Sequence, residues 1–310
     1  MKKLDFHVHL QKGLPIEQAT AYFKDMCYRH GYEGVAIMSL YYDHGEYFPE
    51  CNDVALRIKD ALKNSYAFAS LLPNEDFALQ AKRYMQSGFD GIKLIRGGKP
   101  NHQRLSGHFY DSWIYSDFFA LAEEEQIPIL MHNNDPALNW DITRASQRAI
   151  EKGWVYDNTF PSHEYFFCVL ENLLQQYPRL NIALAHMGFY SEDLDRAQAL
   201  LDKYPKLKFD ITPALNIYFE MSADREKARK FFLDNSERLI FGTDAENELV
   251  GFAREYNDKK NLITSTFLSG NANSEYVFDD KIIRPIGLQS HILDNIYYNN
   301  ALRFISLHKK

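Results

Sequence analysis

The stretch Leu4–Leu10, LDFHVHL, is a short apolar run that carries two histidines two residues apart. Side chains alternate between the two faces of a strand, so His7 and His9 are expected to lie on the same face, near the carboxyl end of the strand. Paired imidazoles are common ligands of zinc and other divalent metals. The pair alone is equally consistent with two polar residues at a strand end, so its meaning depends on how the later strands end.

From Leu10 almost to its end, the chain alternates between amphipathic stretches and short β-branched or aliphatic runs, which is typical of repeated βα units. The predicted strands are 4–10, 34–40, 66–71, 91–95, 127–132, 181–186, 207–212 and 239–244. The predicted helices are 15–30, 52–63, 74–87, 111–125, 162–177, 191–204 and 223–235, with a closing helix or helix pair at 286–307. Eight parallel strands that alternate with helices predict an α/β fold, the (β/α)8 TIM barrel.

Two stretches interrupt this alternation. Residues 133–161 follow the fifth predicted strand and contain Trp140, Trp154 and several Asn and Asp residues, which favours an ordered cap with a helix at 141–152. Residues 245–285 follow the eighth strand and are rich in Asn, Asp and Ser, so a second loop excursion is expected there. The length of 310 residues fits one barrel with insertions, so residues 1–310 are predicted to form a single domain.

The composition argues against several classes of protein. The formal net charge is −7 and no Lys/Arg tract is present, so nucleic-acid binding is not expected. No uncharged stretch approaches the length of a membrane span, and the first strand begins too close to Met1 to leave room for a secretory signal. We therefore expect a cytoplasmic protein without membrane association. The cysteines, at 27, 51 and 168, are far apart and suggest neither a disulfide framework nor a thiolate metal site.

Polar side chains with metal-binding or acid–base chemistry recur on the predicted strands. They are His7 and His9 on the first strand, Lys93 on the fourth, and His132, His186 and Asp244 at the ends of the fifth, sixth and eighth. The carboxyl ends of parallel barrel strands open on one face, where the active sites of this fold lie. These residues, scattered in sequence, are therefore expected to converge on a site for a divalent metal.

The motifs LDFHVHL, IPILMH, NIALAHMG and LIFGTD, with NNALRF at residues 299–304, resemble the amidohydrolase superfamily. The resemblance is to its amidohydrolase-related branch, which includes metal-dependent hydrolases and decarboxylases, and it extends from Leu4 to Phe304. It implies a distorted (β/α)8 barrel that holds one or two divalent metals. By this resemblance the metal ligands are His7, His9, His132 and Asp244. The catalytic residues are then Asp244, which takes a proton from water, and His186, which is either a further ligand or a proton-handling histidine.

The expected cofactor is one zinc ion, because imidazole and carboxylate are good zinc donors. Lys93 leaves a second metal open, since a carboxylated lysine on this strand bridges two metals in binuclear members of the superfamily. An unmodified Lys93 would instead contact an anionic substrate. Arg96 lies in a cationic stretch after the fourth strand and is predicted to bind a substrate carboxylate, with a solvated basic loop as the alternative.

The predicted function is hydrolysis of a small-molecule ester, lactone or amide by metal-activated water. The alternative is a metal-dependent, non-oxidative decarboxylase of a small carboxylic acid. Decarboxylating members often carry an acidic residue in place of the leading histidine, and the intact HVH slightly favours hydrolysis. A phosphoesterase would need further ligands on the middle strands, two of which end in Leu40 and Leu71. A metal-free ligand-binding barrel and a homo-oligomer both remain open.

Overall fold

The structure is a computed structural model that describes residues 1–10, 12–43, 46–73, 75–95, 99, 108–214, 216–246, 252–278 and 281–309. Within these residues the core is a nine-stranded sheet in the order β10-β9-β8-β7-β6-β5-β2-β1-β11, with every neighbouring pair parallel. Its strands are β1 (Leu4–His9), β2 (Gly34–Met38), β5 (Tyr66–Ser70), β6 (Gly91–Ile95), β7 (Ile129–His132), β8 (Ile182–Leu184), β9 (Lys208–Asp210), β10 (Leu239–Ile240) and β11 (Ala245–Glu246). The predicted parallel α/β class is confirmed.

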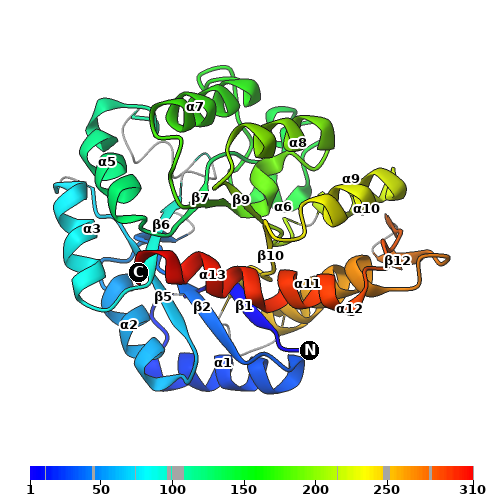
Figure 1. Ribbon diagram of the computed structural model, residues 1–310, viewed down its shortest axis with the longest axis horizontal. Coiled ribbons are helices and arrows are strands. Elements are labelled where there is room, and N and C mark those ends of the chain that lie inside the picture. The colour runs from blue at the N-terminus through cyan, green and yellow to red at the C-terminus, as the bar shows by residue number, and fades with distance from the viewer. Residues whose placement is uncertain are drawn as a thin grey trace.

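The sheet curls so that its two edges meet at the short segment between β10 and β11 (Figure 1). The Phe6 N–H donates to the Phe241 carbonyl at 3.1 Å, and the Asp244 N–H donates to the His7 carbonyl at 2.8 Å. Of the expected strand 239–244, the structure forms only β10 at 239–240, and the next strand, β11, begins after Asp244. Asp244 has a φ of 57°, which is not an extended conformation.

Helices surround the sheet (Figure 1). They are α1 (Ile16–His30), α2 (Cys51–Ala61), α3 (Phe77–Gln86), α5 (Ser116–Glu125), α6 (Gln147–Glu151), α7 (His163–Gln176), α8 (Leu194–Lys203), α9 (Ile217–Ser222), α10 (Arg225–Asp234), α11 (Phe252–Ser269), α12 (Ser290–Asp294) and α13 (Asn300–Ser306). Side-chain caps fix several starts: Ser162 accepts from the Tyr165 N–H, and Asp193 accepts from the Arg196 N–H. Gly31 ends α1 in the left-handed conformation, with a φ of 68°.

Aromatic rings from the sheet and from α13 fill one end of the barrel interior. Phe6 makes edge-to-face contacts with Phe68 and Phe304, with ring centroids 5.4 and 5.6 Å apart. All three side chains are fully buried. Since Phe304 lies on α13, this helix covers the amino ends of the strands, while their carboxyl ends carry the polar residues described below.

The expectation of a loop excursion over residues 245–285 is wrong. The segment contains α11, of 18 residues, and a hairpin of β12 (Tyr276–Phe278) and β13 (Lys281–Ile283). The inner face of α11 includes Asn257, Lys260 and Thr264, which are buried and polar. These polar residues interrupt the apolar stripe expected of a buried helix face, which Ile263, Phe267 and Leu268 supply only further along the helix.

The first excursion also differs from its prediction, because residues 133–161 contain η2 (Ala137–Trp140) and the short α6 instead of a helix over 141–152.

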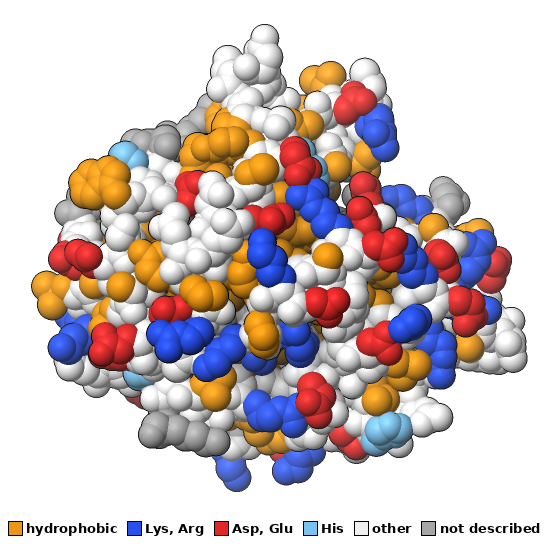
Figure 2. All heavy atoms as spheres, turned by 45° about the horizontal axis from the view of Figure 1, so that its top comes forward, with side chains coloured by type: hydrophobic (Ala, Val, Ile, Leu, Met, Phe, Trp, Pro, Cys, Tyr) orange, Lys and Arg blue, Asp and Glu red, His pale blue; other side chains and the backbone are white. Residues whose placement is uncertain are grey.

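Among the described residues, no helix combines the length and the apolar character that a membrane crossing requires. Acidic and basic side chains are interspersed over the described surface in Figure 2.

The aromatic packing beneath the barrel can be tested with Phe304→Ala. Removing a fully buried ring should lower the free energy of unfolding by about 3–5 kcal/mol, measured by denaturant titration. The matched control is Tyr28→Ala, because Tyr28 is 89% exposed and its loss should change stability by no more than about 0.5 kcal/mol. Equal unfolding midpoints for the two variants would contradict this assignment of the core.

Candidate metal centre

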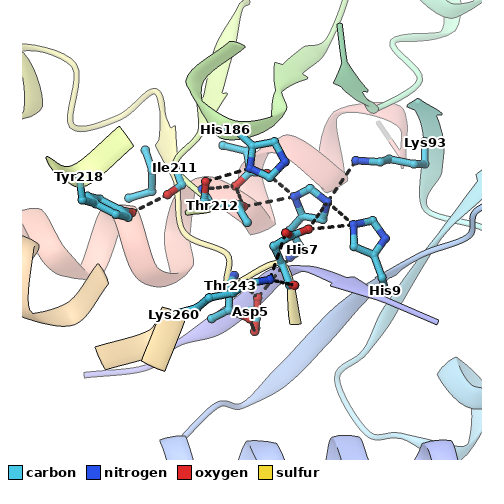
Figure 3. A network of polar contacts seen from close by, with 12 residues as sticks. Asp5, His7, His9, Lys93, His186, Ile211, Thr212, Tyr218, Thr243 and Lys260 are labelled. Carbon is cyan, nitrogen blue, oxygen red and sulfur yellow. Dashed lines mark hydrogen bonds and ion pairs between the residues drawn. The ribbon is translucent and has the colours of Figure 1, made fainter. Parts of the chain in front are cut away.

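Three side chains meet where β1 approaches β11. His7 Nε2 lies 3.0 Å from His9 Nε2 and 3.9 Å from Asp244 Oδ1, and His9 Nε2 lies 3.0 Å from Asp244 Oδ1 (Figure 3). One ligand atom from each residue falls within 4.8 Å of the other two. In the part of the chain that the structure describes, this is the one group of three or more His, Cys, Asp or Glu side chains with such spacing.

The backbone between β10 and β11 brings Asp244 to the histidines. A Cβ atom added to Gly242 would lie 2.7 Å from Thr212 Oγ1 and 2.8 Å from the His7 Cβ, so only glycine allows this close approach. The left-handed conformation of Asp244, with a φ of 57°, then ends the extended run. A non-glycine residue in this conformation is uncommon and is found preferentially at functional sites.

A second buried carboxylate orients His7. The His7 Nδ1–H donates to Asp210 Oδ2 at 2.6 Å. The lone pair on His7 Nε2 is therefore left facing His9 and Asp244. Thr212 supports Asp210, since its backbone N–H donates to Asp210 Oδ1 at 2.9 Å and its hydroxyl donates to the same oxygen. Burial, with the nearby Lys93 charge, holds the pKa of His7 well below its usual value, so the imidazole is neutral at pH 7.

A third buried carboxylate fixes β1 against the segment that carries Asp244. Asp5 Oδ1 accepts the Thr243 N–H at 2.9 Å and the His7 N–H at 3.3 Å, and Asp5 Oδ2 accepts the Thr243 hydroxyl at 2.5 Å. Burial raises the pKa of Asp5 to about 7. Asp5, Asp210 and Thr212 were not among the predicted site residues. The sequence feature that could have identified them is the presence of Asp5 and Asp210 within predicted strands, where buried side chains are otherwise apolar.

Two lysine amines contact members of the cluster: Lys93 contacts His7 (Figure 3), and Lys260 contacts Asp244. Lys93 Nζ lies 3.1 Å from His7 Nε2, and burial lowers its pKa to about 8. Lys260 Nζ donates to the Asp244 carbonyl at 2.6 Å and to Asp244 Oδ2 at 3.2 Å. Burial alone would raise the pKa of Asp244, but the Lys260 charge and the hydrogen bond with His9 bring it well below its usual range. Asp244 is therefore a carboxylate.

His186 is not at the end of a strand as expected. β8 ends at Leu184, and His186, Met187, Gly188 and Phe189 all have left-handed backbones with φ between 54° and 61°. This conformation costs about 1–2 kcal/mol per non-glycine residue, so the surrounding packing must compensate for it. The His186 Nδ1–H donates to the Thr212 carbonyl at 3.0 Å, and burial lowers the pKa of His186 to about 3.

His132 is not one of the clustered residues and lies next to His186. Its ring centroid is 4.9 Å from that of His186. His132 Nε2 is buried without a hydrogen-bond partner and lies 3.4 Å from Asp135 Oδ1. The structure thus brings His7, His9 and Asp244 together and places His132 further away.

The three clustered side chains fit a divalent metal. They offer two imidazole nitrogens and one carboxylate oxygen, which is a donor set that zinc and similar ions accept. His7 is neutral and its second nitrogen is held by a carboxylate, as is usual for histidines that bind metals. His132 Nε2, which is buried without a hydrogen-bond partner, is a further imidazole nitrogen outside this group.

A pocket with about 500 Å³ of empty space adjoins Lys93. Its walls include the aromatic side chains of Tyr41, Tyr42, Phe77, Tyr110 and Tyr115. Lys93 lines this pocket and also contacts His7, so it connects the pocket to the three donors. Arg96, the predicted substrate-binding arginine, lies outside the described residues.

The orienting role of Asp210 can be tested with Asp210→Asn. Loss of the charge behind His7 should weaken the binding of a divalent metal by about 10–100-fold, measured by titrating metal into chelator-treated protein. Asp90→Asn is the matched control, because Asp90 is equally buried, pairs with Lys59 at 2.7 Å and precedes β6 at the opposite end of the barrel. Equal metal affinities for the two variants would contradict the assigned role.

Comparisons with known proteins identify the family of the chain. The family model described as amidohydrolase matches residues 4–307, and no curated protein matches the chain. One similar solved structure is an uncharacterized TIM-barrel protein from Bordetella bronchiseptica, with 14% identity, 100% of both chains covered and a TM-score of 0.59. A second is 4-oxalomesaconate hydratase from Rhodopseudomonas palustris, with 14% identity, 99% of this chain and 96% of that chain covered, and a TM-score of 0.59.

A third is a dihydroxybenzoic acid decarboxylase from Polaromonas with bound manganese and the inhibitor 2-nitroresorcinol, with 16% identity, 100% of this chain and 98% of that chain covered, and a TM-score of 0.54. At these identities the solved structures show that the fold is shared, and they show no more than that. The family model, in contrast, spans nearly the whole sequence, including the HVH motif and the segment that carries Asp244. The chain therefore belongs to the amidohydrolase family.

Proposed function

We propose that the protein is a metal-dependent hydrolase of a small-molecule ester, lactone or amide. The observation that carries the proposal is the convergence of His7 Nε2, His9 Nε2 and Asp244 Oδ1 within 4.8 Å. These residues would hold one divalent ion, with zinc as the expected metal and His132 as an additional ligand. A divalent metal at this position supplies Lewis-acid activation of water or of a substrate oxygen.

Asp244 and His186 are the proposed proton-transfer groups. Asp244 is ionised, and its Oδ1 faces the histidines while its Oδ2 is bound to Lys260. Asp244 is thus placed to accept the proton of an attacking water molecule. His186 is neutral, and its Nδ1–H is committed to the Thr212 carbonyl, so Nε2 is the nitrogen available to exchange a proton with the substrate.

The pocket beside Lys93 is the proposed substrate site. Its aromatic walls suit a planar or unsaturated small molecule. The Lys93 amine can donate a hydrogen bond to an anionic oxygen of the substrate. This role requires an unmodified Lys93, whose contact with His7 favours one metal over two. Arg96 stays a candidate partner for a substrate carboxylate from its place in the sequence alone.

A decarboxylase of a small carboxylic acid is the second candidate. It is supported by the aromatic pocket with a buried amine and by the likeness to a decarboxylase that binds manganese. Product analysis separates the two functions. Hydrolysis of esters, lactones or amides without release of carbon dioxide is expected, whereas release of carbon dioxide from aromatic or unsaturated acids, with no hydrolytic activity, would establish the decarboxylase instead.

The proposed ligands can be tested with the double variant His7→Ala, His9→Ala. These substitutions keep the backbone hydrogen bonds that join β1 to residues 241–244, so metal content measured by elemental analysis should fall to background while circular dichroism stays unchanged. The double variant His291→Ala, His308→Ala removes two histidines outside the cluster and should keep the wild-type metal content. Full metal occupancy after loss of both β1 histidines would exclude them as ligands.

The role of His186 can be tested with His186→Asn. Loss of a positioned acid or base should lower turnover by about 10²–10⁴-fold, with the metal content retained. Steady-state kinetics and elemental analysis on the same preparation measure both quantities. Unchanged turnover would exclude a role in proton transfer, and loss of the metal would make His186 a ligand.

A further inference from the structure

Lys260 is a buried side chain for which the proposed reaction has no role. It lies on α11 and is only 4% exposed. Its Nζ donates to two oxygens of the same residue, the Asp244 carbonyl at 2.6 Å and Asp244 Oδ2 at 3.2 Å (Figure 3). Its Nζ also lies 4.8 Å from the centre of the Tyr256 ring. The amine therefore forms hydrogen bonds with both the backbone and the carboxylate of a proposed metal ligand.

The surrounding contacts of α11 hold Lys260 in this place. One turn before it, the Asn257 amide donates to the Glu246 carbonyl of β11 at 2.8 Å and to the Tyr22 hydroxyl at 2.5 Å. One turn after it, the buried Thr264 hydroxyl donates to the Lys260 carbonyl at 3.0 Å. The helix is thus attached to the barrel beside the segment that carries Asp244. These contacts fix the position of Lys260 next to Asp244.

Asp244 depends on this amine in two ways. Its backbone is in the left-handed conformation, which the hydrogen bond to its carbonyl stabilises. Its carboxylate, with a side chain that is 25% exposed, lies between His9 and Lys260, and an ionised group with this little access to water is unfavourable without a cation. Lys260 occupies Oδ2 and leaves Oδ1 facing His9, so it neutralises the carboxylate without blocking the oxygen that faces the histidines.

We propose that Lys260 is the internal counter-ion of Asp244, which stabilises the cluster in the metal-free protein and lowers its affinity for a divalent cation. This inference rests on the proposed metal site. A metal at the cluster would lie a few ångströms from the ammonium group, and like charges at that distance in a buried site repel strongly. Removing the amine removes this repulsion and leaves a carboxylate that a metal can neutralise. The loss of one orienting hydrogen bond acts in the opposite direction but is the smaller effect.

The test compares wild-type protein with Lys260→Met after removal of metal with a chelator. Zinc is titrated into each protein by calorimetry with a competing chelator, and thermal unfolding is followed with and without zinc. Lys260→Met should bind zinc at least about 10-fold more tightly. The repulsion between two cations a few ångströms apart is larger than the stabilisation lost with one hydrogen bond. The metal-free form of this variant should melt at a lower temperature than the metal-free wild type, and zinc should restore most of the difference.

Two variants serve as controls. Lys260→Arg keeps the charge and should keep the zinc affinity close to that of the wild type. Lys59→Met removes another lysine that pairs with a buried aspartate, Asp90, at 2.7 Å and at the opposite end of the barrel, so it should leave the affinity unchanged even if it lowers stability. If Lys260→Met does not fold without metal, Lys260→Gln, which keeps a hydrogen-bond donor but not the charge, is measured in the same way.

The outcomes distinguish this inference from the proposed function. Wild-type protein that binds no zinc would overturn the metal site itself. Wild-type protein that binds zinc, together with a Lys260→Met variant of equal or weaker affinity, would overturn the counter-ion role alone. Unchanged melting of metal-free Lys260→Met would also overturn it, whether or not the site holds a metal.

Discussion

Closure of the barrel and assembly of the site both depend on the contact between β1 and residues 241–244. Hydrogen bonds across it bring the two edges of the sheet together, and the Asp5 carboxylate reinforces them by accepting from both His7 and Thr243. Gly242 is required because any side chain there would collide with β1. The same contact sets His7 and His9 opposite Asp244. Closure of the sheet and assembly of the donor cluster are therefore one structural event.

The charges around this contact are mutually compensating. Three buried aspartates and two buried lysines surround imidazoles whose low pKa values keep them neutral, and each charged group has a partner within hydrogen-bond distance. Buried charged groups are stable only with such partners, and removal of one partner leaves the other charge uncompensated. This explains why substitutions at Asp210 and Lys260 are expected to act on metal binding, although neither residue is one of the three clustered donors.

The sequence predicted the parts of the structure that follow simple periodicities. Alternation in LDFHVHL placed His7 and His9 on one face, and βα alternation located the strands to within a few residues. The helix α11 was not predicted because the polar residues Asn257, Lys260 and Thr264 interrupt the apolar pattern of its buried face. The buried apolar residues of that face, Ile263, Phe267 and Leu268, lie toward the end of the helix. Its contribution to the site, the Lys260 amine, was missed for the same reason.

Other features were beyond sequence reasoning because they depend on tertiary packing. The left-handed run at His186 and the left-handed Asp244 replace predicted strand ends, and such conformations are stable only where surrounding contacts compensate for them. The pairing of Asp210 with His7 joins residues about two hundred positions apart in the chain, a relationship that spacing alone does not reveal. The separation of His132 from the other donors likewise appears only in three dimensions.

The most direct test of the metal site is an anomalous difference map from crystals of the zinc-loaded protein, recorded at the zinc absorption edge. We predict a strong peak in contact with His7 Nε2, His9 Nε2 and a carboxylate oxygen of Asp244. A map with no peak at these three atoms, or with its strong peak on other residues, would contradict the proposed metal site.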